Sequence, residues 1–407
     1  MTDPTDTTDT TDTTDTTDTQ QVSIITVLHG EVEFIPLILD NYQRFLETQV
    51  LELIVIDDGV QSLASHFTDV PNCLYLHLNE GEITGFFKQI IEGFKGPNKS
   101  PLYYQQRLRT LPQGFKRDYG CGMSSHPHIF HMNADCIYDA KSIDRKLRFM
   151  KRVGAECTYN DTTLCYDIYN KKLYKTESVH KIYESTLCHT REFWKRKGFQ
   201  WSDVEYEGKY FHYNNGNDRK QDNYYDTIQL LSIHNMNRYK PVEVTVEGKE
   251  IKIPDMIAEI KIETHPFVMT MNDIYGKNPI TMLGINSEFL ENVKEDSWET
   301  YQVTDKWKQT KLAKQVKGFR RDFNVLVFGS KHPAWDLFEH VPFDLVMLET
   351  QKNSEQMVSI LTSCKKHPYI CVQGVFVRKD FLEPAHDAEG GEGADKDWET
   401  LEPEPEQ

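Results

Sequence analysis

Two polar side chains follow a short apolar run near the middle of the chain, and both are residue types that hold a cation. The apolar run His128–Met132 has the length of a strand, and Asn133, Ala134 and Asp135 come directly after it. Residues two apart at the end of a strand point the same way, so Asn133 and Asp135 could share one divalent cation through their side-chain oxygens. The structural alternative is an Asx turn that only closes the strand.

Two further polar clusters also follow strand-like runs. Asp57, Asp58 and Gly59 follow the run 51–56, and Asn79, Glu80 and Gly81 follow the run 73–78. An earlier β-branched run covers 22–28, and helical spacing of apolar residues covers 33–46 and roughly 85–94. Alternating strands and helices with short connections predict a parallel sheet covered on both faces. Because ligands bind at the carboxyl ends of such strands, we expect the polar clusters to gather along one edge.

The turn after the first strand has no glycine-rich phosphate cradle. His29-Gly30-Glu31 is not a GxGxxG turn, and the chain contains no GxxxxGK[ST] segment. A dinucleotide or P-loop site is therefore disfavoured, and a bound diphosphate would need another source of positive charge, such as a divalent cation.

Charge and composition exclude several classes of protein. The chain has 407 residues and a net charge of −17, but residues 1–20 and 383–407 together hold 15 of those negative charges. The body is nearly neutral, which argues against nucleic-acid binding. Both tails have few apolar residues to bury, so we expect them to be disordered. No run is long enough for a transmembrane segment, no secretory signal is present, and eight irregularly spaced cysteines indicate a reducing, cytoplasmic setting.

Six segments, taken in order, resemble one enzyme family. They are SIITVLHG (23–30), ELIVIDDG (52–59), NEGEITGFFKQIIEGF (79–94), FHMNADCIYDAKSI (130–143), TREFWKRKGF (190–199) and QDNYYDTIQL (221–230). Together they resemble a family 2 glycosyltransferase with the GT-A fold. The resemblance implies a Rossmann-like, mostly parallel central sheet with helices on both faces, which we assign to residues 21–286.

The resemblance also implies where a nucleotide-sugar donor would bind. Thr26, Leu28, His29 and Glu31 would border the base and ribose, and Asp57 or Asp58 would accept a hydrogen bond from one of them. Asn133 and Asp135 stand at the family's D-x-D motif, which binds Mn²⁺ or Mg²⁺ and, through the ion, the diphosphate. Because Asn133 replaces a charged residue, we expect weaker metal binding.

The family's general base is the Asp of an E-D pair that begins a helix. That position corresponds to Asp222, where Gln221 replaces the acid, and Asp226 and Asp218 are the alternatives. A carboxylate here would take the proton of the acceptor hydroxyl, whereas the structural alternative is a helix-start carboxylate that favours the helix dipole. His265 is a candidate further metal ligand, although a lone histidine is more often structural.

The remaining segments have no match in the family. Residues 97–127 form a basic stretch that would be either a lid reaching the phosphates or a solvated insertion. Residues 287–320 are expected to be a charged helical connector, and 321–382 a small βαβαβ unit.

The leading interpretation is a metal-dependent glycosyltransferase that uses a UDP-linked sugar and a carbohydrate or other hydroxyl acceptor, with inversion if Asp222 is the base. A nucleotidyltransferase is disfavoured by the absence of a Gly- and Lys/Arg-rich loop after the first strand. A catalytically silent GT-A domain that only binds a nucleotide sugar or a partner is the other alternative, because fold does not fix function.

Overall fold

The computed structural model describes about half of the chain in detail. The described residues are 21–47, 50–96, 99–167, 172–178, 182–204, 207–216, 218–221, 226–231, 242–243, 275, 280–285, 287, 298–303, 316, 323–328, 337, 341–348, 361, 369–372 and 375–378. Both tails, Asp222 and His265 lie outside these residues.

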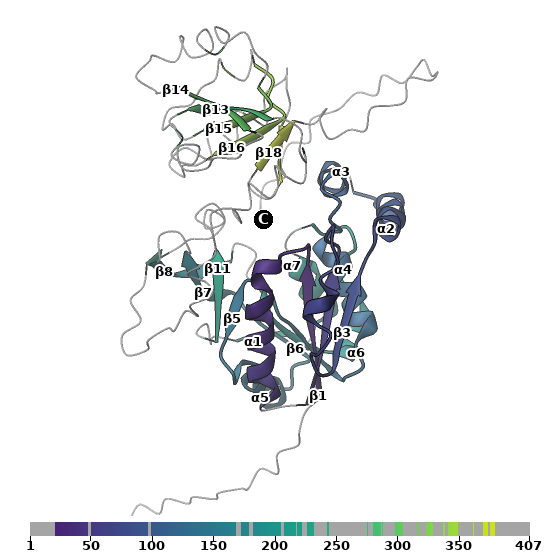
Figure 1. Ribbon diagram of the computed structural model, residues 1–407. Helices are drawn as coiled ribbons and strands as arrows, with labels where there is room; N and C mark the ends of the chain where they lie inside the picture. The colour runs from purple at the N-terminus through teal and green to yellow at the C-terminus, as the bar shows by residue number, and fades with distance from the viewer. Residues whose placement is uncertain are drawn as a thin grey trace, which may run out of the picture.

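The largest sheet has seven strands in the order β10-β6-β9-β4-β1-β2-β3 (Figure 1). β4, β1, β2 and β3 are parallel, whereas β9 runs antiparallel to β4 and β6. The chain moves outward from β1 to β3 and then returns to the other side of β1, so the topological switch point lies between β1 and β4. The strands are β1 (Gln21–Leu28), β2 (Val50–Asp57), β3 (Cys73–His77), β4 (His128–His131), β6 (Cys157–Asn160), β9 (Tyr183–Thr190) and β10 (Asp218–Lys220).

Helices cover both faces of this sheet, as the sequence predicts. Side chains of α1 and α5 share one apolar core with the sheet, and those of α2, α3, α4, α6 and α7 share the core on the other face. The helices are α1 (Ile35–Leu46), α2 (Glu80–Gly93), α3 (Ser100–Arg107), α4 (Gln113–Met123), α5 (Ser142–Val153), α6 (Arg191–Arg196) and α7 (Glu207–Asn215), with short 3-10 turns η1 (Val32–Phe34) and η2 (Ala64–His66).

Local sequence signals explain where these helices begin and end. Asn79 caps α2 because its side chain accepts hydrogen bonds from the backbone N–H groups of Gly81 and Glu82. The Glu82 side chain accepts in turn from the Asn79 backbone N–H, which completes a capping box. Thr190 caps α6 in the same way through Phe193 N. Gly154 ends α5 in the left-handed conformation, at φ +66°.

Part of the basic stretch 97–127 is packed into the fold and is not a solvated insertion. It contains α4, whose buried residues include Phe115, Lys116 and Arg117, and α4 packs on the sheet. A Cβ on Gly120 would lie 2.7 Å from a methyl group of Ile25, so glycine allows this close contact between helix and sheet.

A second sheet has five strands in the order β12-β8-β7-β11-β5. These are β5 (Cys136–Tyr138), β7 (Thr162–Asp167), β8 (Lys172–Glu177), β11 (Thr227–Leu231) and β12 (Val242–Glu243). The expected helix at 221–230 is wrong over its second half, because residues 227–231 pair as a strand with β7 and β5. The run Thr227–Leu231 satisfies a strand as well as a helix, and its strand partners lie far away in sequence.

A third sheet contains the C-terminal strands in the order β14-β13-β15-β16-β18-β17, and Figure 1 shows it beyond the carboxyl edge of the first sheet. Three of its strands match the expected βαβαβ unit, but β18 adds a hairpin. Residues 298–303 form a strand where a helical connector was expected. Residues 280–285 were assigned to the domain 21–286, but they pair with β15 of the C-terminal sheet. The strands are β13 (Ile280–Ile285), β14 (Trp298–Val303), β15 (Val325–Phe328), β16 (Leu345–Leu348), β17 (Tyr369–Val372) and β18 (Val375–Arg378).

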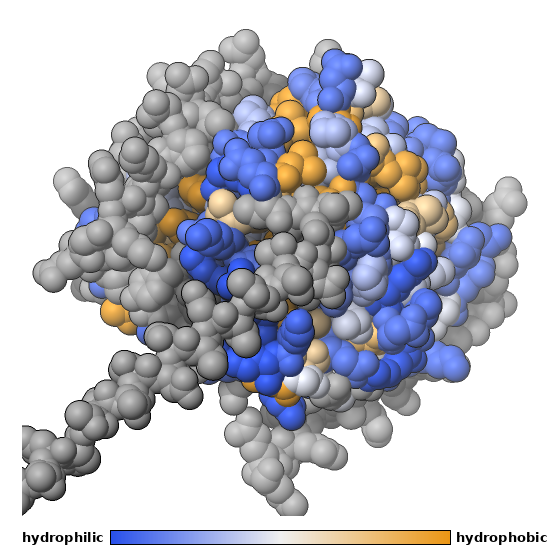
Figure 2. Space-filling model, turned by 90° about the horizontal axis from the view of Figure 1, so that it is seen from below, coloured by the Kyte–Doolittle hydropathy of each residue, from blue (hydrophilic) through white to orange (hydrophobic). Residues whose placement is uncertain are grey.

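The amino edge of the first sheet lies at the bottom of Figure 1, and Figure 2 views the molecule from that side. Hydrophilic residues cover most of the coloured surface there, with smaller hydrophobic groups between them. The clusters of polar residues singled out in the sequence lie at the other end of the strands, at the carboxyl edge.

Candidate functional site

Asp57 closes the turn at the end of β2 and is fully buried. Its Oδ1 accepts hydrogen bonds from the backbone N–H of Gly30, at 3.0 Å, and of Gly59, at 2.9 Å. Its Oδ2 accepts from the hydroxyl of Tyr75 at 2.5 Å. Asp57 therefore holds the loop after β1 and the loop after β2 together, so the backbone at this edge of the sheet has a fixed position.

Asp58 lies at the centre of a buried charge network. Its Oδ1 lies 3.0 Å from Lys116 Nζ and 3.1 Å from His29 Nδ1, and its Oδ2 accepts from the backbone N–H of Leu111. Burial alone would raise the pKa of Asp58, but Lys116 and His29 outweigh it and hold that pKa below its usual range. Burial acts to lower the pKa of His29, yet its bond to Asp58 raises it overall. Both oxygens of Asp58 thus serve contacts inside the protein.

The two β1 residues expected to border the nucleotide lie in the sheet core. The side chains of Thr26 and Leu28 are buried within β1. Leu28 contributes its carbonyl to the edge, where it accepts from Lys116 Nζ at 3.2 Å and from Asp58 N at 3.3 Å. Any contact from Leu28 to a ligand at the edge would therefore run through its backbone.

Asn133 at the end of β4 is held by an arginine of α4. Arg117 donates from Nη2 to Asn133 Oδ1 at 2.9 Å and from Nε to Glu207 Oε1 at 2.6 Å. The third guanidinium nitrogen, Nη1, is buried and has no hydrogen-bond partner among the described residues. Since the amide oxygen of Asn133 already faces a cationic side chain, this arrangement does not present it to a metal ion.

Asp135 differs from the acids of β2 because no Lys or Arg among the described residues pairs with it. Its Oδ2 accepts from Gln229 Nε2 at 3.4 Å, which is a long hydrogen bond. Burial raises the pKa of Asp135 to about 6, and the negative charge of Glu31 acts in the same direction. Glu31 accepts from the backbone N–H of His29 and comes from the loop after β1, whereas Asp135 comes from the loop after β4. Both acids therefore stand at the topological switch point.

A second group of acids includes Glu207 and Glu184, whose charges both act on Arg117. Glu207 begins α7, and Glu184 in β9 accepts from the backbone N–H of Gly208 at 3.2 Å. Burial and the charge of Glu207 raise the pKa of Glu184 to about 8. The same two causes raise the pKa of Asp203 to about 7. This edge therefore holds carboxyl groups that can carry or release a proton near neutral pH.

Asp222 follows Gln221, which the structure does describe. Gln221 donates its backbone N–H to Tyr159 O at 2.8 Å, next to the pairing of β10 with β6. Because β6 ends at the carboxyl edge, the register brings position 221 to the same edge as the other acids. Of the alternatives, Asp218 contacts His212 Nδ1 at 3.2 Å. Asp226 pairs with Arg145 immediately before β11.

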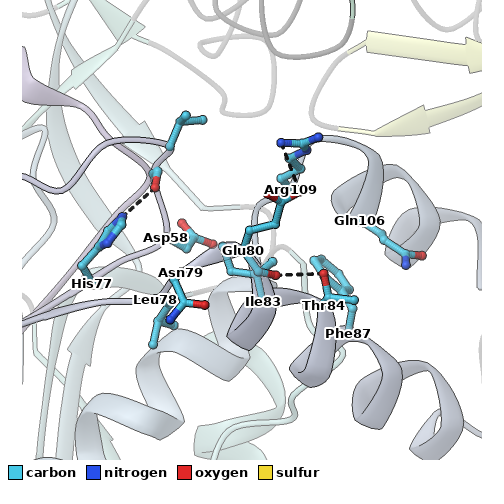
Figure 3. Close-up of a pocket in the computed structure, with 12 residues that line it drawn as sticks. Asp58, His77, Leu78, Asn79, Glu80, Ile83, Thr84, Phe87, Gln106 and Arg109 are labelled. Atoms are coloured by element: carbon cyan, nitrogen blue, oxygen red, sulfur yellow. Dashed lines mark hydrogen bonds and ion pairs between the residues drawn. The ribbon is translucent and has the colours of Figure 1, made fainter.

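A pocket opens at the carboxyl ends of β2 and β3, with a volume of about 320 Å³. Figure 3 shows Asp58 and Asn79 between His77 on one side and Glu80 with Arg109 on the other. His77 Nε2 lies 2.9 Å from Gly59 O, and Arg109 pairs with Glu80 at 3.4 Å. Ile83 and Phe87 of α2 add apolar lining. Apolar walls with a few polar groups are typical of small-molecule sites.

Several of these residues were not singled out as site residues by the sequence. Lys116 and Arg117 were visible only as part of a basic stretch, because their partners lie up to 90 residues away. One signal could have identified Glu207: it is the acid that starts the first long helix after the TREFWKRKGF segment. The E-D pattern expected at that helix start was placed fourteen residues later, at 221–222.

No family model matches the sequence, and no curated protein matches it either. Among solved structures, residues 1–349 of S. aureus TarS are similar with a TM-score of 0.35 and 10% identity, covering 54% of this chain and 62% of that one. The same protein in complex with UDP-GlcNAc has a TM-score of 0.35 and 8% identity, covering 63% and 66%. The mannosyltransferase PcManGT from Pyrobaculum calidifontis, in complex with GDP-Man and Mn²⁺, has a TM-score of 0.33 and 11% identity, covering 53% and 59%. The chain thus spans less than two thirds of these structures.

None of the helices in the described part of the chain is both long and apolar enough to cross a membrane.

Proposed function

We propose that this protein is a glycosyltransferase that moves a sugar from a UDP-linked donor to the hydroxyl of a carbohydrate or another acceptor. The observation that carries the proposal is the acid pair Glu31 and Asp135 at the switch point between β1 and β4. In open α/β sheets that crevice is where a nucleotide ligand binds. Two carboxylates that no Lys or Arg of the described residues pairs with favour a ligand that brings positive charge, such as an ion bound to a diphosphate.

The carboxylates fit Mn²⁺ or Mg²⁺ better than the pair Asn133 and Asp135 does. Asp135 and Glu31 supply charged oxygens, which both ions prefer, whereas Asn133 Oδ1 accepts from Arg117. When bound, the cation would neutralise charge on the leaving diphosphate. Asn133 would then act on the site through Arg117, whose buried Nη1 has no partner among the described residues.

The pocket at β2 and β3 is the proposed seat of the nucleoside. It adjoins Asp58 and Gly59, the segment that the family resemblance assigns to the base and ribose. Asn79 and the loop carbonyl of Gly59 offer hydrogen-bonding groups, and Ile83 and Phe87 offer an apolar face to a base. The diphosphate would then extend from the pocket toward Glu31 and Asp135.

Transfer requires a base for the acceptor hydroxyl. In the proposed single displacement, the acceptor oxygen forms a bond to the anomeric carbon, the bond to the diphosphate breaks, and a carboxylate takes the acceptor proton. Asp222 remains the proposed base. Asp203 and Glu207 are the alternative that the geometry raises, because Glu207 binds Arg117, which contacts Asn133, and burial and the charge of Glu207 raise the pKa of Asp203 to about 7.

The decisive experiment measures sugar transfer and donor hydrolysis from a panel of nucleotide sugars with Mn²⁺, for wild type and four variants. Asp135→Asn should abolish metal-dependent binding of UDP. Asp222→Asn should keep that binding and lose transfer by roughly 10²–10⁴-fold if Asp222 is the base. If Asp203→Asn or Glu207→Gln is the inactive variant instead, the base belongs to the cluster at Arg117.

A silent domain that binds a nucleotide sugar without transferring it is the second candidate. The contact of Arg117 with Asn133 favours it, since that oxygen is directed away from a catalytic metal. Wild-type protein that binds UDP with Mn²⁺ and yet transfers sugar from no donor would establish this alternative. Wild-type protein that binds no nucleotide at all would overturn both.

A further inference from the structure

Three residues that commonly bind metals meet in the core behind the N-A-D turn. Cys121 comes from α4, His131 ends β4 and His189 lies in β9, and all three are completely buried. Their sulfur and ring-nitrogen atoms all lie within 4.8 Å of one another, and the Nε2 atoms of the two histidines are 2.9 Å apart. These are sulfur and nitrogen donors, unlike the oxygen donors at Glu31 and Asp135.

The hydrogen bonds around the histidines fix one of the two facing nitrogens as an acceptor. His189 Nδ1 lies 2.9 Å from the carbonyl of Thr190, so it must carry the proton and leave Nε2 as an acceptor. Without metal, the 2.9 Å contact places the proton of His131 on Nε2, while its Nδ1 is buried and has no partner among the described residues, so no other contact holds that tautomer. With the proton on Nδ1, His131 also presents a lone pair from Nε2, and the two imidazoles form a ligand pair.

The surroundings keep the imidazoles neutral, which is the form that binds metal. Burial lowers the pKa of His189 to about 4, and burial, Arg117 and His189 all lower the pKa of His131. Burial raises the pKa of the Cys121 thiol, so without a cation it stays protonated. Phe199 packs edge-on against His131, and Phe211 packs at a tilt against His189, so the walls of the cluster are apolar.

We propose that Cys121, His131 and His189 form a site for one thiophilic metal ion, Zn²⁺ or Cu⁺. One thiolate with two imidazoles is a donor set that suits both ions, whereas Mn²⁺ and Mg²⁺ prefer oxygen. On binding, the Cys121 S–H bond breaks, sulfur binds the metal and the proton passes to solvent. The complex is then neutral with Cu⁺ and carries one positive charge with Zn²⁺, which would take a further ligand.

The distances require only modest adjustment. With bonds of about 2.0–2.1 Å to nitrogen and about 2.3 Å to sulfur, tetrahedral ligand atoms lie about 3.4–3.6 Å apart. The two histidine nitrogens must therefore separate slightly, and the sulfur must approach by about an ångström. A metal-free His131–His189 hydrogen bond is the competing explanation for the 2.9 Å contact.

Such an ion would fasten together three elements that carry the proposed donor site. Cys121 is one helical turn from Arg117 on α4, and His131, the last residue of β4, precedes Asn133 by two residues. The ion would fix the helix that supplies Arg117 against the strand that leads to Asn133. This inference does not depend on the proposed transferase activity, and its test measures metal binding directly.

The test uses the full chain, purified from medium containing Zn²⁺ and, separately, loaded with Cu⁺ under anaerobic conditions. Metal content after gel filtration should be close to one ion per chain for the ion that the site takes. Cys121→Ser and His189→Gln should lower the affinity for that ion by more than about 100-fold, beyond the usual loss from outer-shell changes. Cys165→Ser is the matched control, because Cys165 is an equally buried thiol in the second sheet and should leave affinity unchanged.

Two further measurements keep the result clear if a variant folds poorly. Co²⁺ added to wild type should give a sulfur-to-metal charge-transfer band, and Zn²⁺ binding should release a proton measurable in weakly buffered solution. Asp135→Asn should keep both signals, which separates this site from the one proposed for Mn²⁺. Wild type that binds neither Zn²⁺ nor Cu⁺ more tightly than Cys121→Ser would overturn the proposal and leave the metal-free hydrogen bond as the explanation.

Discussion

The acids after β2 and the acid after β4 have similar positions in the sheet and opposite surroundings. Asp57 and Asp58 have all four oxygens engaged by backbone N–H groups, Tyr75, Lys116 and His29. Asp135 has only a long hydrogen bond from Gln229, a weak one from the Cys136 thiol at 3.6 Å, and the charge of Glu31 nearby. A carboxylate with all its partners holds the structure together, whereas one without them costs stability and is available to a ligand.

The largest effect on stability is expected at Asp58. Asp58→Ala leaves the completely buried ammonium of Lys116 without its counter-ion, and breaking a buried pair costs about 3–5 kcal/mol of unfolding free energy. Urea unfolding measures this loss. The double variant Asp58→Ala/Lys116→Met removes both charges and should recover part of it. If the single variant is as stable as wild type, the network is not what holds the loop after β2.

The raised pKa of Asp135 predicts that replacing this residue increases the free energy of unfolding, whereas replacing Asp58 lowers it. Its pKa rises from 3.8 to about 6 in the folded protein, so the folded state holds the proton more tightly and loses stability as pH rises through that window. A pKa difference of roughly two units corresponds to a loss of at most about 3 kcal/mol of unfolding free energy, and that loss is complete above about pH 6. Without divalent ions, Asp135→Asn should therefore be more stable than wild type at pH 7.5 and similar to it at pH 3.5.

Mn²⁺ and a matched control sharpen that result. Mn²⁺ should raise the melting temperature of wild type more at pH 7.5 than at pH 5, because the ion competes with the proton on Asp135. Asp57→Asn should lose stability at both pH values, since an amide N–H₂ group would face donors there. An Asp135→Asn variant that loses stability at pH 7.5 would show that this carboxylate is structural too.

The sequence predicted the part of the fold that depends on local patterns. β1, β2 and β3 are long apolar runs, and the polar residues after them gather at one edge as expected. The partners of those residues could not be predicted, because Lys116 and Asp58 are 58 residues apart and their contact depends on how α4 packs. The pairing of 280–285 with the C-terminal strands is equally non-local. Tertiary contacts also decided that 227–231 is a strand and not a helix.

The cluster at Arg117 is expected to show a smaller effect than the pair at Asp58, because other acids remain beside the arginine. Glu207→Gln should cost about 1.5–3 kcal/mol through loss of a charge-assisted hydrogen bond. It should also bring the pKa of Glu184 down from about 8, since the charge of Glu207 is one cause of that shift. NMR titration of the Glu184 carboxyl checks this. Glu192→Gln is the control, because Glu192 pairs with Lys195 at the exposed surface and should cost under about 1 kcal/mol.

The smallest effect, at Tyr75, tests how Asp57 is held. Tyr75→Phe removes the hydroxyl that donates to Asp57 Oδ2 and accepts from Leu63 N at 2.7 Å. Asp57 keeps both backbone donors on Oδ1, so the loss of these two hydrogen bonds should cost about 1–3 kcal/mol, at about 0.5–1.5 kcal/mol for each bond. Tyr119→Phe, a ring packed against Phe115, is the control and should change the unfolding free energy less. If Tyr75→Phe costs as much as Asp58→Ala, the tyrosine and not the backbone is the main support of Asp57. If it also weakens UDP binding while Tyr119→Phe does not, Asp57 contacts the donor and is a binding residue like Asp135, not only a structural one.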